Sequence, residues 1–475
     1  MARVRISVLD KEEEDLVHKY SLKSLSEIGV LIRSNSVLEM LEKSGASVDH
    51  NKGIARISES MVDEALKMAP KSFKLCGRDP KNDLEIPVDK DPYISTDGLT
   101  IYMRDIETGE KRNATRKDLG DFARLADALE SISFFWPIVT ASDVFEPAHT
   151  AYEQWTSLQN CTMHTEGDSV SAIDARKQIE LASLILGGAD ELKKRPIFSV
   201  VCCPIAPLSF EKGSVEAQVE LAKAGIPIVS MSMSLSGMSS PVTRAGTIVN
   251  ANTENLASLV ITQFAAPGAP HIYSSESIPI DMSTGNIDYS APEVLPINAA
   301  TGQMAKRYGR PCMVAGWSVG GNTPGMMSSF SELAGTCMGA MSLTDLAPGM
   351  GSLDSAKGCA LEQLVIDAYL WESFRVFMRD FTVSEETIAL DVVKEVGHGN
   401  TFLTHPHTAK NFKKELFFRG KKKMEWEATL STKMVPEAKE IAKKLLREHE
   451  VDPIDKDIVK QGEQILKEYE KSLIA

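Results

Sequence analysis

The chain shows a regular alternation of apolar runs and amphipathic stretches from about residue 91 onward. Short runs rich in apolar and β-branched residues predict buried strands, and apolar positions spaced three and four apart predict the helices between them. The predicted strands are YISTDG from 93, SFFWPIV from 133, CTMHT from 161, PIFSVVC from 196, PIVSMSM from 227, PHIYSS from 270, PCMVAGW from 311 and LTDLAPG from 343. Such repeated strand–helix units favour an α/β fold of the (β/α)8 TIM-barrel type.

Glycine and proline mark several of the predicted helix ends. Gly225, Gly268 and Gly309 each stand two residues before a proline that opens the next predicted strand. Glycine is common just past a helix C-terminus, and proline cannot continue the helix. The sequence has neither a GxGxxG after its first predicted strand nor a GxxxxGK[ST]. The sequence therefore does not indicate a nucleotide-binding fold.

The ends of the chain follow a different pattern from the barrel. In the first part, Leu22, Leu25, Ile28, Leu31 and Ile32 recur at helical spacing. We therefore expect residues 1–90 to form a mainly helical N-terminal region, 91–380 the TIM-barrel catalytic domain and 381–475 a C-terminal helical extension. The Lys and Glu residues of the extension are most simply the solvated faces of helices.

Charge and composition narrow the function classes. The chain has 52 basic and 66 acidic side chains and a net charge of −14, which disfavours nucleic acids and anionic membranes as partners. A negative field suits a small cationic ligand. The N-terminal residues lack the apolar core of a signal peptide, and no stretch reaches the roughly 18 apolar residues of a membrane helix. The 7 cysteines show no CxxC spacing. We expect a cytoplasmic protein without disulfides or a zinc site.

Aromatic residues near the predicted strand ends supply the first site candidates. In a TIM barrel the working residues lie at the C-terminal ends of the strands and in the following loops. Trp136, Tyr273 and Trp317 stand at or near such positions. A quaternary ammonium cannot donate a hydrogen bond, so aromatic faces and a nearby carboxylate recognise it. Each of these aromatic residues could instead serve packing alone.

Polar residues at the same strand ends supply the candidate chemistry. Asp97 and Glu276 are the acids with the best positions, and we expect them to act catalytically. Asp97 could instead form a turn, and Glu276 could be a loop hydrogen-bond partner. His164 is a binding candidate that could equally be a structural histidine. Because the predicted strand ends carry no lysine and no HxH or HExxH pair, neither a Schiff base nor a bound metal is expected there.

Three stretches resemble the trimethylamine methyltransferase family. They are the run from LSEIGVLIRSNSVLEMLEKSG to FKLCGRDP, the run DIETGEKRNATRKDLGDFARLADALESISF, and GNTFLTHPHTAKNFKKELFF from Gly399. The resemblance covers nearly the whole chain. It implies a TIM barrel with a helical N-terminal region. It also implies transfer of a methyl group from an amine to the Co(I) of a separate corrinoid protein, so no cofactor is expected to be bound permanently.

One position departs from the founding members of this family. They carry pyrrolysine in the loop after the seventh strand, and here that loop reads AGWSVGGNTPG over residues 315–325. Gly316 and Ser318 align with the motif, and the pyrrolysine position falls on Gly320 or Gly321. A quaternary ammonium is already charged and releases a neutral amine, so it needs no such residue. The chain is therefore similar to the non-pyrrolysine members that resemble glycine betaine:corrinoid methyltransferases.

The resemblance implies a substrate class and leaves the member of that class open. Glycine betaine, which would give dimethylglycine, is the first hypothesis, and proline betaine, carnitine and γ-butyrobetaine are alternatives. His164, Ser275 and Asn322 are candidate donors to a betaine carboxylate. A non-catalytic betaine-binding barrel and a lyase resembling uroporphyrinogen decarboxylases are rival hypotheses. The expected partners are a corrinoid protein and a second copy of the chain in a homo-oligomer.

Overall fold

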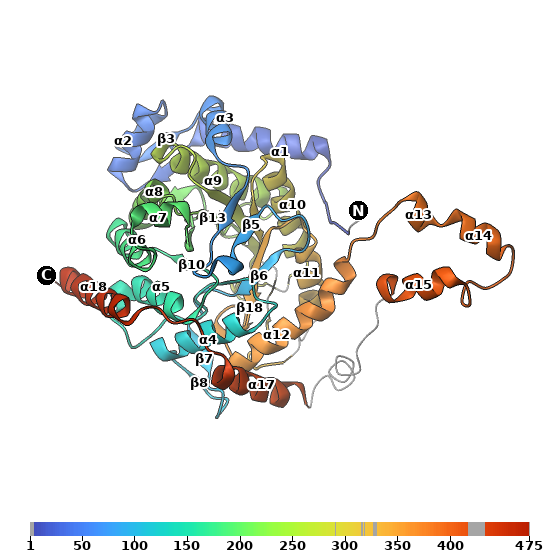
Figure 1. The fold of residues 1–475 in the computed structure, drawn as a ribbon. Coiled ribbons are helices and arrows are strands. Elements are labelled where there is room, and N and C mark those ends of the chain that lie inside the picture. Colours follow the sequence, from blue (N-terminus) through green and yellow to red (C-terminus); the bar gives the residue numbers. More distant parts are fainter. Residues whose placement is uncertain are drawn as a thin grey trace.

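A closed barrel of eight parallel strands forms the centre of the molecule and confirms the predicted (β/α)8 TIM barrel (Figure 1). The computed structural model describes residues 4–289, 291–314, 317, 319–325, 330–416 and 433–474, apart from the side chains of 330–333 and 337. Around the barrel the strands are β6 (Tyr93–Thr96), β9 (Phe134–Phe135), β10 (His164–Asp168), β11 (Phe198–Cys202), β13 (Ile228–Ser232), β15 (His271–Ser275), β17 (Cys312–Val314) and β18 (Leu346–Met350).

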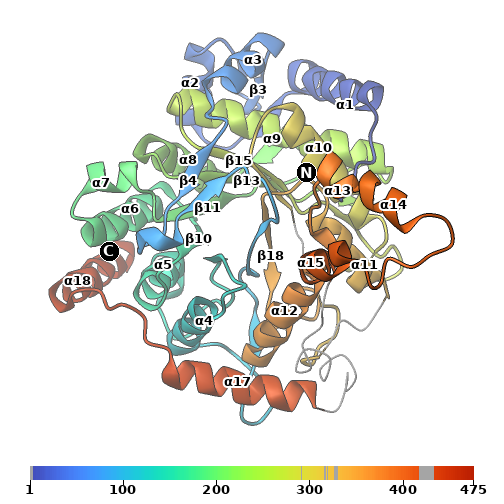
Figure 2. The same ribbon diagram turned by 45° about the vertical axis from the view of Figure 1, so that its right-hand side comes forward.

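A helix follows each barrel strand, and these helices surround the barrel (Figure 2). They are α4 (Arg116–Ala128), α5 (His149–Asn160), α6 (Ala172–Leu186), α8 (Lys212–Ala224), α9 (Arg244–Ala265), α10 (Val294–Arg307), α11 (Phe330–Ala340) and α12 (Leu361–Phe374). Local signals fix their ends. A capping box of Thr115 and Asp118 starts α4, and left-handed Gly225 (φ 77°) ends α8 as the sequence indicates.

Side chains from alternating strand positions fill the barrel. Phe134 of β9 and Trp136, just after this strand, belong to the same core cluster as Val229 and Met231 of β13. Alternate residues of a strand point to the same face, so this cluster identifies the inward positions of the barrel. The hairpin of β4 (Phe73–Leu75) and β5 (Leu84–Ile86) contributes Leu75 to the same cluster. The hairpin thereby closes the N-terminal end of the barrel and leaves the opposite end, the mouth, for a ligand.

The N-terminal region contains more strand than predicted. It holds α1 (Lys11–Lys23), a π-helical turn, α2 (Asn35–Lys43) and α3 (Glu59–Met68), but also β1 (Val30–Ile32), β2 (Ser47–Asp49) and β3 (Ile54–Arg56). The helix expected to run through Leu31 and Ile32 was wrong, because Gly29 ends it with φ 80°. The three strands form one sheet in the order β1-β3-β2, and β1 pairs in parallel with β12 (Ser209–Phe210), a strand in the loop after β11. This sheet fastens the region to the barrel.

The last part of the chain has two different arrangements. Helices α13 (Glu385–Ile388), α14 (Leu390–Val396) and α15 (Pro406–Glu415) extend away from the barrel (Figure 1). Helix α17 (Met434–Glu448) packs on α12 and α4, and α18 (Lys456–Ile474) packs on α6 and α5. Within the described ranges, no helix has the length and apolar character needed to cross a membrane.

Candidate functional site

The mouth of the barrel brings together the two acids predicted to be catalytic. Asp97 directly follows β6, where its backbone N–H donates to the Met350 carbonyl at 3.0 Å. Glu276 directly follows β15, where its N–H donates to the Ser232 carbonyl at 2.9 Å. These backbone bonds continue the barrel pairing by one residue and hold both acids at its rim. The two carboxyls lie close enough that Asp97 raises the pKa of Glu276.

Two further acids from β10 enter the same space. The sequence prediction placed this strand at 161–165, whereas β10 spans His164–Asp168. Asp168 therefore occupies the C-terminal end that the prediction gave to His164, and the Trp136 indole N–H lies 3.4 Å from its Oδ2. Glu166 lies one layer deeper and is 2 % exposed. Its Oε2 lies 3.3 Å from the Ser199 hydroxyl oxygen, while Oε1 has no hydrogen-bond partner within the described part of the chain.

Trp136 is the predicted aromatic residue that lies inside the barrel. It belongs to the inward-facing cluster and is 5 % exposed. A Cβ added to Gly98 would lie 2.3 Å from Cε2 of Trp136, so only glycine fits where the chain turns past the ring. The Asp97–Gly98 turn thus covers part of the indole. The remaining surface of the ring is what a cationic ligand can contact.

Tyr289 is an aromatic member of the mouth that the sequence analysis missed. It lies in the long loop after β15, and its hydroxyl is 3.5 Å from Oε2 of Glu276. Glu276, Asp97 and Cys203 all raise the pKa of Tyr289, after burial as the largest cause. These interactions place the phenol among the acids. No strand-end rule would have found it, because it stands 14 residues after Ser275.

Three of the predicted binding residues lie away from the mouth. His164 begins β10, at the closed end of the barrel, where Nδ1 bonds the Cys76 carbonyl at 2.9 Å and Nε2 the Ser199 hydroxyl at 2.9 Å. Burial lowers the pKa of His164 to about 4, so the ring is neutral. Tyr273 points outward, and its hydroxyl donates to Asn252 on α9 at 2.7 Å. Ser275 shares the outward side of β15 with Tyr273 and donates to Ser277 at 2.8 Å.

The loop after β17 contains the other two predicted binding residues. Trp317 is 6 % exposed and packs in the cluster between the barrel wall and α4 and α12, not in the inward-facing cluster. It interacts with Asp367 of α12. Asn322 is exposed, and its carbonyl accepts from the Arg104 guanidinium. The family motif positions Gly316 and Ser318 lie outside the described residues. The structure therefore separates Trp317 from Trp136.

The four inward carboxyls of the mouth all have pKa values above the ordinary range. Burial raises the pKa of Glu166 to about 8 and that of Asp168 to about 6. Burial and the Asp97 carboxyl raise the pKa of Glu276 to about 8, and burial also raises the pKa of Asp97. Desolvation disfavours the charged form of each acid, and neighbouring carboxyls add repulsion. A bound cation would lower the pKa values of these acids, because it favours their ionised form.

Other features of the barrel do not suit catalysis. Cys203 faces these acids, and burial together with Asp168 raises the pKa of its thiol, which keeps it protonated and unreactive. Among the described residues, no group of three or more His, Cys, Asp or Glu side chains is placed to hold a metal ion.

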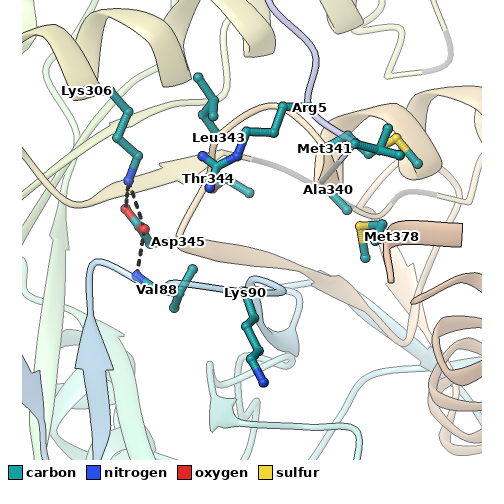
Figure 3. A pocket seen from close by; sticks show the side chains of 11 residues that line it. Arg5, Val88, Lys90, Lys306, Ala340, Met341, Leu343, Thr344, Asp345 and Met378 are labelled. Carbon is teal, nitrogen blue, oxygen red and sulfur yellow. Dashed lines mark hydrogen bonds and ion pairs between the residues drawn. The ribbon is translucent and has the colours of Figure 1, made fainter. Parts of the chain in front are cut away.

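A cavity at the opposite end of the barrel is structural (Figure 3). Asp345, just before β18, accepts there from Lys306 Nζ at 2.7 Å and from the backbone N–H of Val88 at 2.9 Å. The charge of Asp345 is therefore already balanced, and the mouth remains the candidate site.

Comparison with known proteins agrees with the barrel fold and identifies its family. Residues 2–471 match the family described as trimethylamine methyltransferase. The trimethylamine methyltransferase of Desulfitobacterium hafniense is 30% identical over 84% of this chain and 80% of its own length. A glycine betaine methyltransferase from the same species is 27% identical over 87% of this chain and 86% of its own. The monomethylamine methyltransferase of Methanosarcina barkeri shares the fold, with a TM-score of 0.51 and 13% identity over 94% of this chain and 89% of that chain.

Proposed function

The chain belongs to the trimethylamine methyltransferase family, and from this premise we propose that it moves a methyl group from a quaternary amine to the Co(I) of a corrinoid protein. The observation that carries the proposal is the pairing of an aromatic wall with acids at the barrel mouth. Trp136 and Tyr289 lie beside Asp168 and Glu276, respectively. Aromatic faces and carboxylates together recognise a cation that has no N–H to donate.

The loop after β17 supports a quaternary rather than a tertiary amine. The position that carries pyrrolysine in founding members of the family falls on Gly320 or Gly321, and glycine has no side chain that could form an adduct with an amine. A quaternary ammonium does not need one, because it leaves as a neutral tertiary amine. Glycine betaine is the first substrate hypothesis, since a relative carries that name. Proline betaine, carnitine and γ-butyrobetaine are the alternatives.

The residues of this chain would act by binding and orientation. The mouth acids would balance the ammonium charge while Trp136 and Tyr289 limit its rotation. The corrinoid of the partner would supply the nucleophile that accepts one methyl carbon, and the electron pair of the broken C–N bond would stay on nitrogen, so that a neutral tertiary amine leaves. No proton moves in this step, so none of the mouth acids has to act as a general acid. Holding the C–N bond in line inside a water-poor barrel would supply the rate enhancement.

The proposal is tested with purified protein and chemically reduced cob(I)alamin, followed by visible spectroscopy. Glycine betaine, proline betaine, carnitine, γ-butyrobetaine, choline and trimethylamine are offered one at a time. We expect methylcobalamin to form with at least one quaternary amine and not with trimethylamine. The test is repeated with a corrinoid protein as acceptor. Binding of an amine without methyl transfer to either acceptor would instead support a non-catalytic binding barrel.

A further inference from the structure

Residues 381–416, here called the arm, leave the barrel and carry a large share of the exposed apolar surface. The arm contains α13, α14 and α15 and projects to one side of the molecule (Figure 1). Of the 24 large apolar side chains that are exposed among the described residues, eight belong to the arm, which is only a small part of the 475-residue chain. Leu390, Val393, Phe402 and Leu403 are among them. Such a concentration is typical of a protein–protein interaction surface.

Hydrogen bonds give the arm a defined shape. At its base, the Arg379 guanidinium donates to the Glu415 carbonyl at 3.0 Å, which brings the two ends of the arm together. Farther out, Nε2 of His405 lies 3.1 Å from Oε2 of Glu395 and joins the start of α15 to α14. A capping box at Ser384 begins α13. The arm is therefore a built projection with a closed base.

The helices of the arm lack the packing that short helices need. They have 4, 7 and 10 residues, and helices of this length are marginal unless another surface packs on them. Within the described ranges, none of the three packs extensively on any other element. In α14, Val392 and Val396 belong to a small cluster confined to that helix and its cap, while Leu390 and Val393 remain exposed. The packing surface must therefore come from another molecule.

The area of the arm matches what one subunit contributes to a lasting interface. The eight exposed apolar residues present roughly 800 Å², about the share of one partner in a stable protein–protein interface. Permanent interfaces are also the more hydrophobic ones. A methyl carrier that comes and goes would leave this surface in water between encounters, whereas a second copy of the chain covers it at all times.

The charge of the arm also suits a second copy. The arm contains four Lys and five acidic residues, so it is close to neutral within a chain of net charge −14. It can approach another negatively charged copy without the repulsion that the rest of the surface would meet. On α15, the exposed side chains of Lys410, Lys413 and Lys414 add positive charge that complements an acidic partner.

We propose that the arm is the subunit-association element of this protein and packs against a second copy of the chain. In a symmetric dimer each copy gives one arm and receives the other, so the same apolar contact is made twice. The inference does not depend on the proposed function, because it uses no residue of the barrel mouth.

Sedimentation equilibrium of the full-length protein at micromolar concentration measures the association. We expect a mass of at least twice the 51.9 kDa of one chain. Leu390→Asp combined with Val393→Asp places two charges on the exposed side of α14 and should raise the dissociation constant at least about tenfold, because an interface would have to bury them. Ile474→Asp is the control. Ile474 is 72% exposed at the end of α18, on the side of the molecule opposite the arm (Figure 1), and its substitution should leave association unchanged. Circular dichroism shows that each variant is folded.

Photo-crosslinking identifies the molecule that covers the arm. A photoreactive phenylalanine analogue replaces Leu403, which is 80% exposed. Illumination of the purified protein should give a covalent product of twice the chain mass on a denaturing gel. This measurement does not require the charged variant to fold.

Three results would overturn the inference. The first is a monomeric unmodified protein that gives no intermolecular crosslink. The second is association that is equally strong with and without the α14 charges, or equally weakened by Ile474→Asp. The third is loss of methyl transfer to a corrinoid protein in the α14 variant while association and transfer to free cobalamin are retained, because the arm would then dock the methyl carrier.

Discussion

Trp136 and Trp317 both follow barrel strands, but their surroundings give them different roles. Trp136 lies in the inward cluster with its N–H toward Asp168, whereas Trp317 packs on the outer side of the wall near Asp367 of α12. We expect Trp136→Phe to weaken binding of the quaternary ammonium about three- to tenfold, because a smaller ring offers a weaker cation–π contact. Trp317→Phe should leave the Kd within about twofold. Calorimetry with glycine betaine and with choline measures both.

The phenylalanine variants are preferred to alanine because both tryptophans are buried. Removing a buried tryptophan entirely costs roughly 3–5 kcal/mol of folding stability and could unfold the protein. Circular dichroism and the melting temperature show whether each variant is folded before its Kd is compared. A larger loss of affinity in the Trp317 variant than in the Trp136 variant would contradict these assignments.

At the residue scale, the sequence placed side chains correctly at the barrel mouth where each directly follows a strand. Asp97, Trp136 and Glu276 each come immediately after the last residue of their strands, and their roles stay predictions. His164 was misplaced because the apolar run 161–165 begins before the strand does. The strand itself, HTEGD, is polar, because Glu166 and Asp168 occupy inward positions that are usually apolar. Tyr289 could not be found, because its approach to Glu276 depends on how a long loop folds back.

At the scale of elements, glycine allows the backbones of two neighbouring elements to approach each other closely. Helix α10 passes the turn after α11 at Gly302, where an added Cβ would lie 1.9 Å from the Ser342 carbonyl oxygen. At Gly335 of α11, an added Cβ would meet no atom of the described residues within 4 Å. Alanine in a helix is more favourable than glycine by about 1 kcal/mol when there is room for it.

These two glycines therefore predict opposite effects of one substitution. Gly302→Ala should destabilise the protein by about 2 kcal/mol or more, because α10 or the backbone at Ser342 must move. Gly335→Ala should leave stability unchanged or raise it by up to about 1 kcal/mol. Urea unfolding monitored by circular dichroism measures both. Destabilisation of similar size in the two variants would show that the clash at Ser342 is not the cause.

The element order was predictable because eight apolar runs in one chain leave few alternatives to a barrel. The N-terminal sheet was not, since β1, β2 and β3 have three residues each and pair with one another and with β12, from a distant loop. Pairing of such short strands depends on tertiary contacts rather than on a local pattern. Leu31 and Ile32 fit the helical spacing of the preceding segment, and only the conformation of Gly29 separates them from it.

At the scale of the whole molecule, the C-terminal helix supports the helices beside the mouth. Helix α18 covers Trp155 of α5, and Glu463 accepts from both the Trp155 indole N–H at 3.0 Å and the Arg116 guanidinium at 3.0 Å. Leu466 of α18 is fully buried in the same cluster, whereas Leu473 is 36% exposed. The C-terminal helix is therefore part of the folded barrel domain rather than a solvated appendage.

This packing predicts different costs for two leucine substitutions in one helix. Leu466→Ala should lower the free energy of unfolding by roughly 2–5 kcal/mol, because it leaves a cavity beside Trp155. Leu473→Ala should change it by less than about 1 kcal/mol. Chemical denaturation followed by Trp fluorescence checks the pair. Ligand affinity of the folded proteins should remain the same in both, since neither leucine contacts the mouth.

The acid cluster also makes the stability of the whole protein depend on pH. Glu276 ionises with a pKa of about 8 in the folded protein against 4.5 in the unfolded chain. Between these values the folded state holds the extra proton, so stability falls as pH rises. His164 has the opposite sign, but its window lies between about 4 and 6.5. From pH 6.5 to 8, Glu166 and Glu276 therefore dominate, and each can cost up to about 2 kcal/mol over this range.

We expect the ligand-free protein to lose stability between pH 6.5 and 8, and Glu276→Gln to lose less of it, because glutamine does not titrate. Asp281→Asn is the matched control in the same loop. Asp281 is half-buried at the start of a turn, where the hydroxyl and N–H of Ser283 lower its pKa to about 2, so it is ionised in both states throughout this range. Urea denaturation at several pH values gives the slopes. If Glu276→Gln and Asp281→Asn both keep the slope of the unmodified protein, Glu276 is not protonated in the folded mouth, and a resident negative charge already awaits the ammonium at neutral pH.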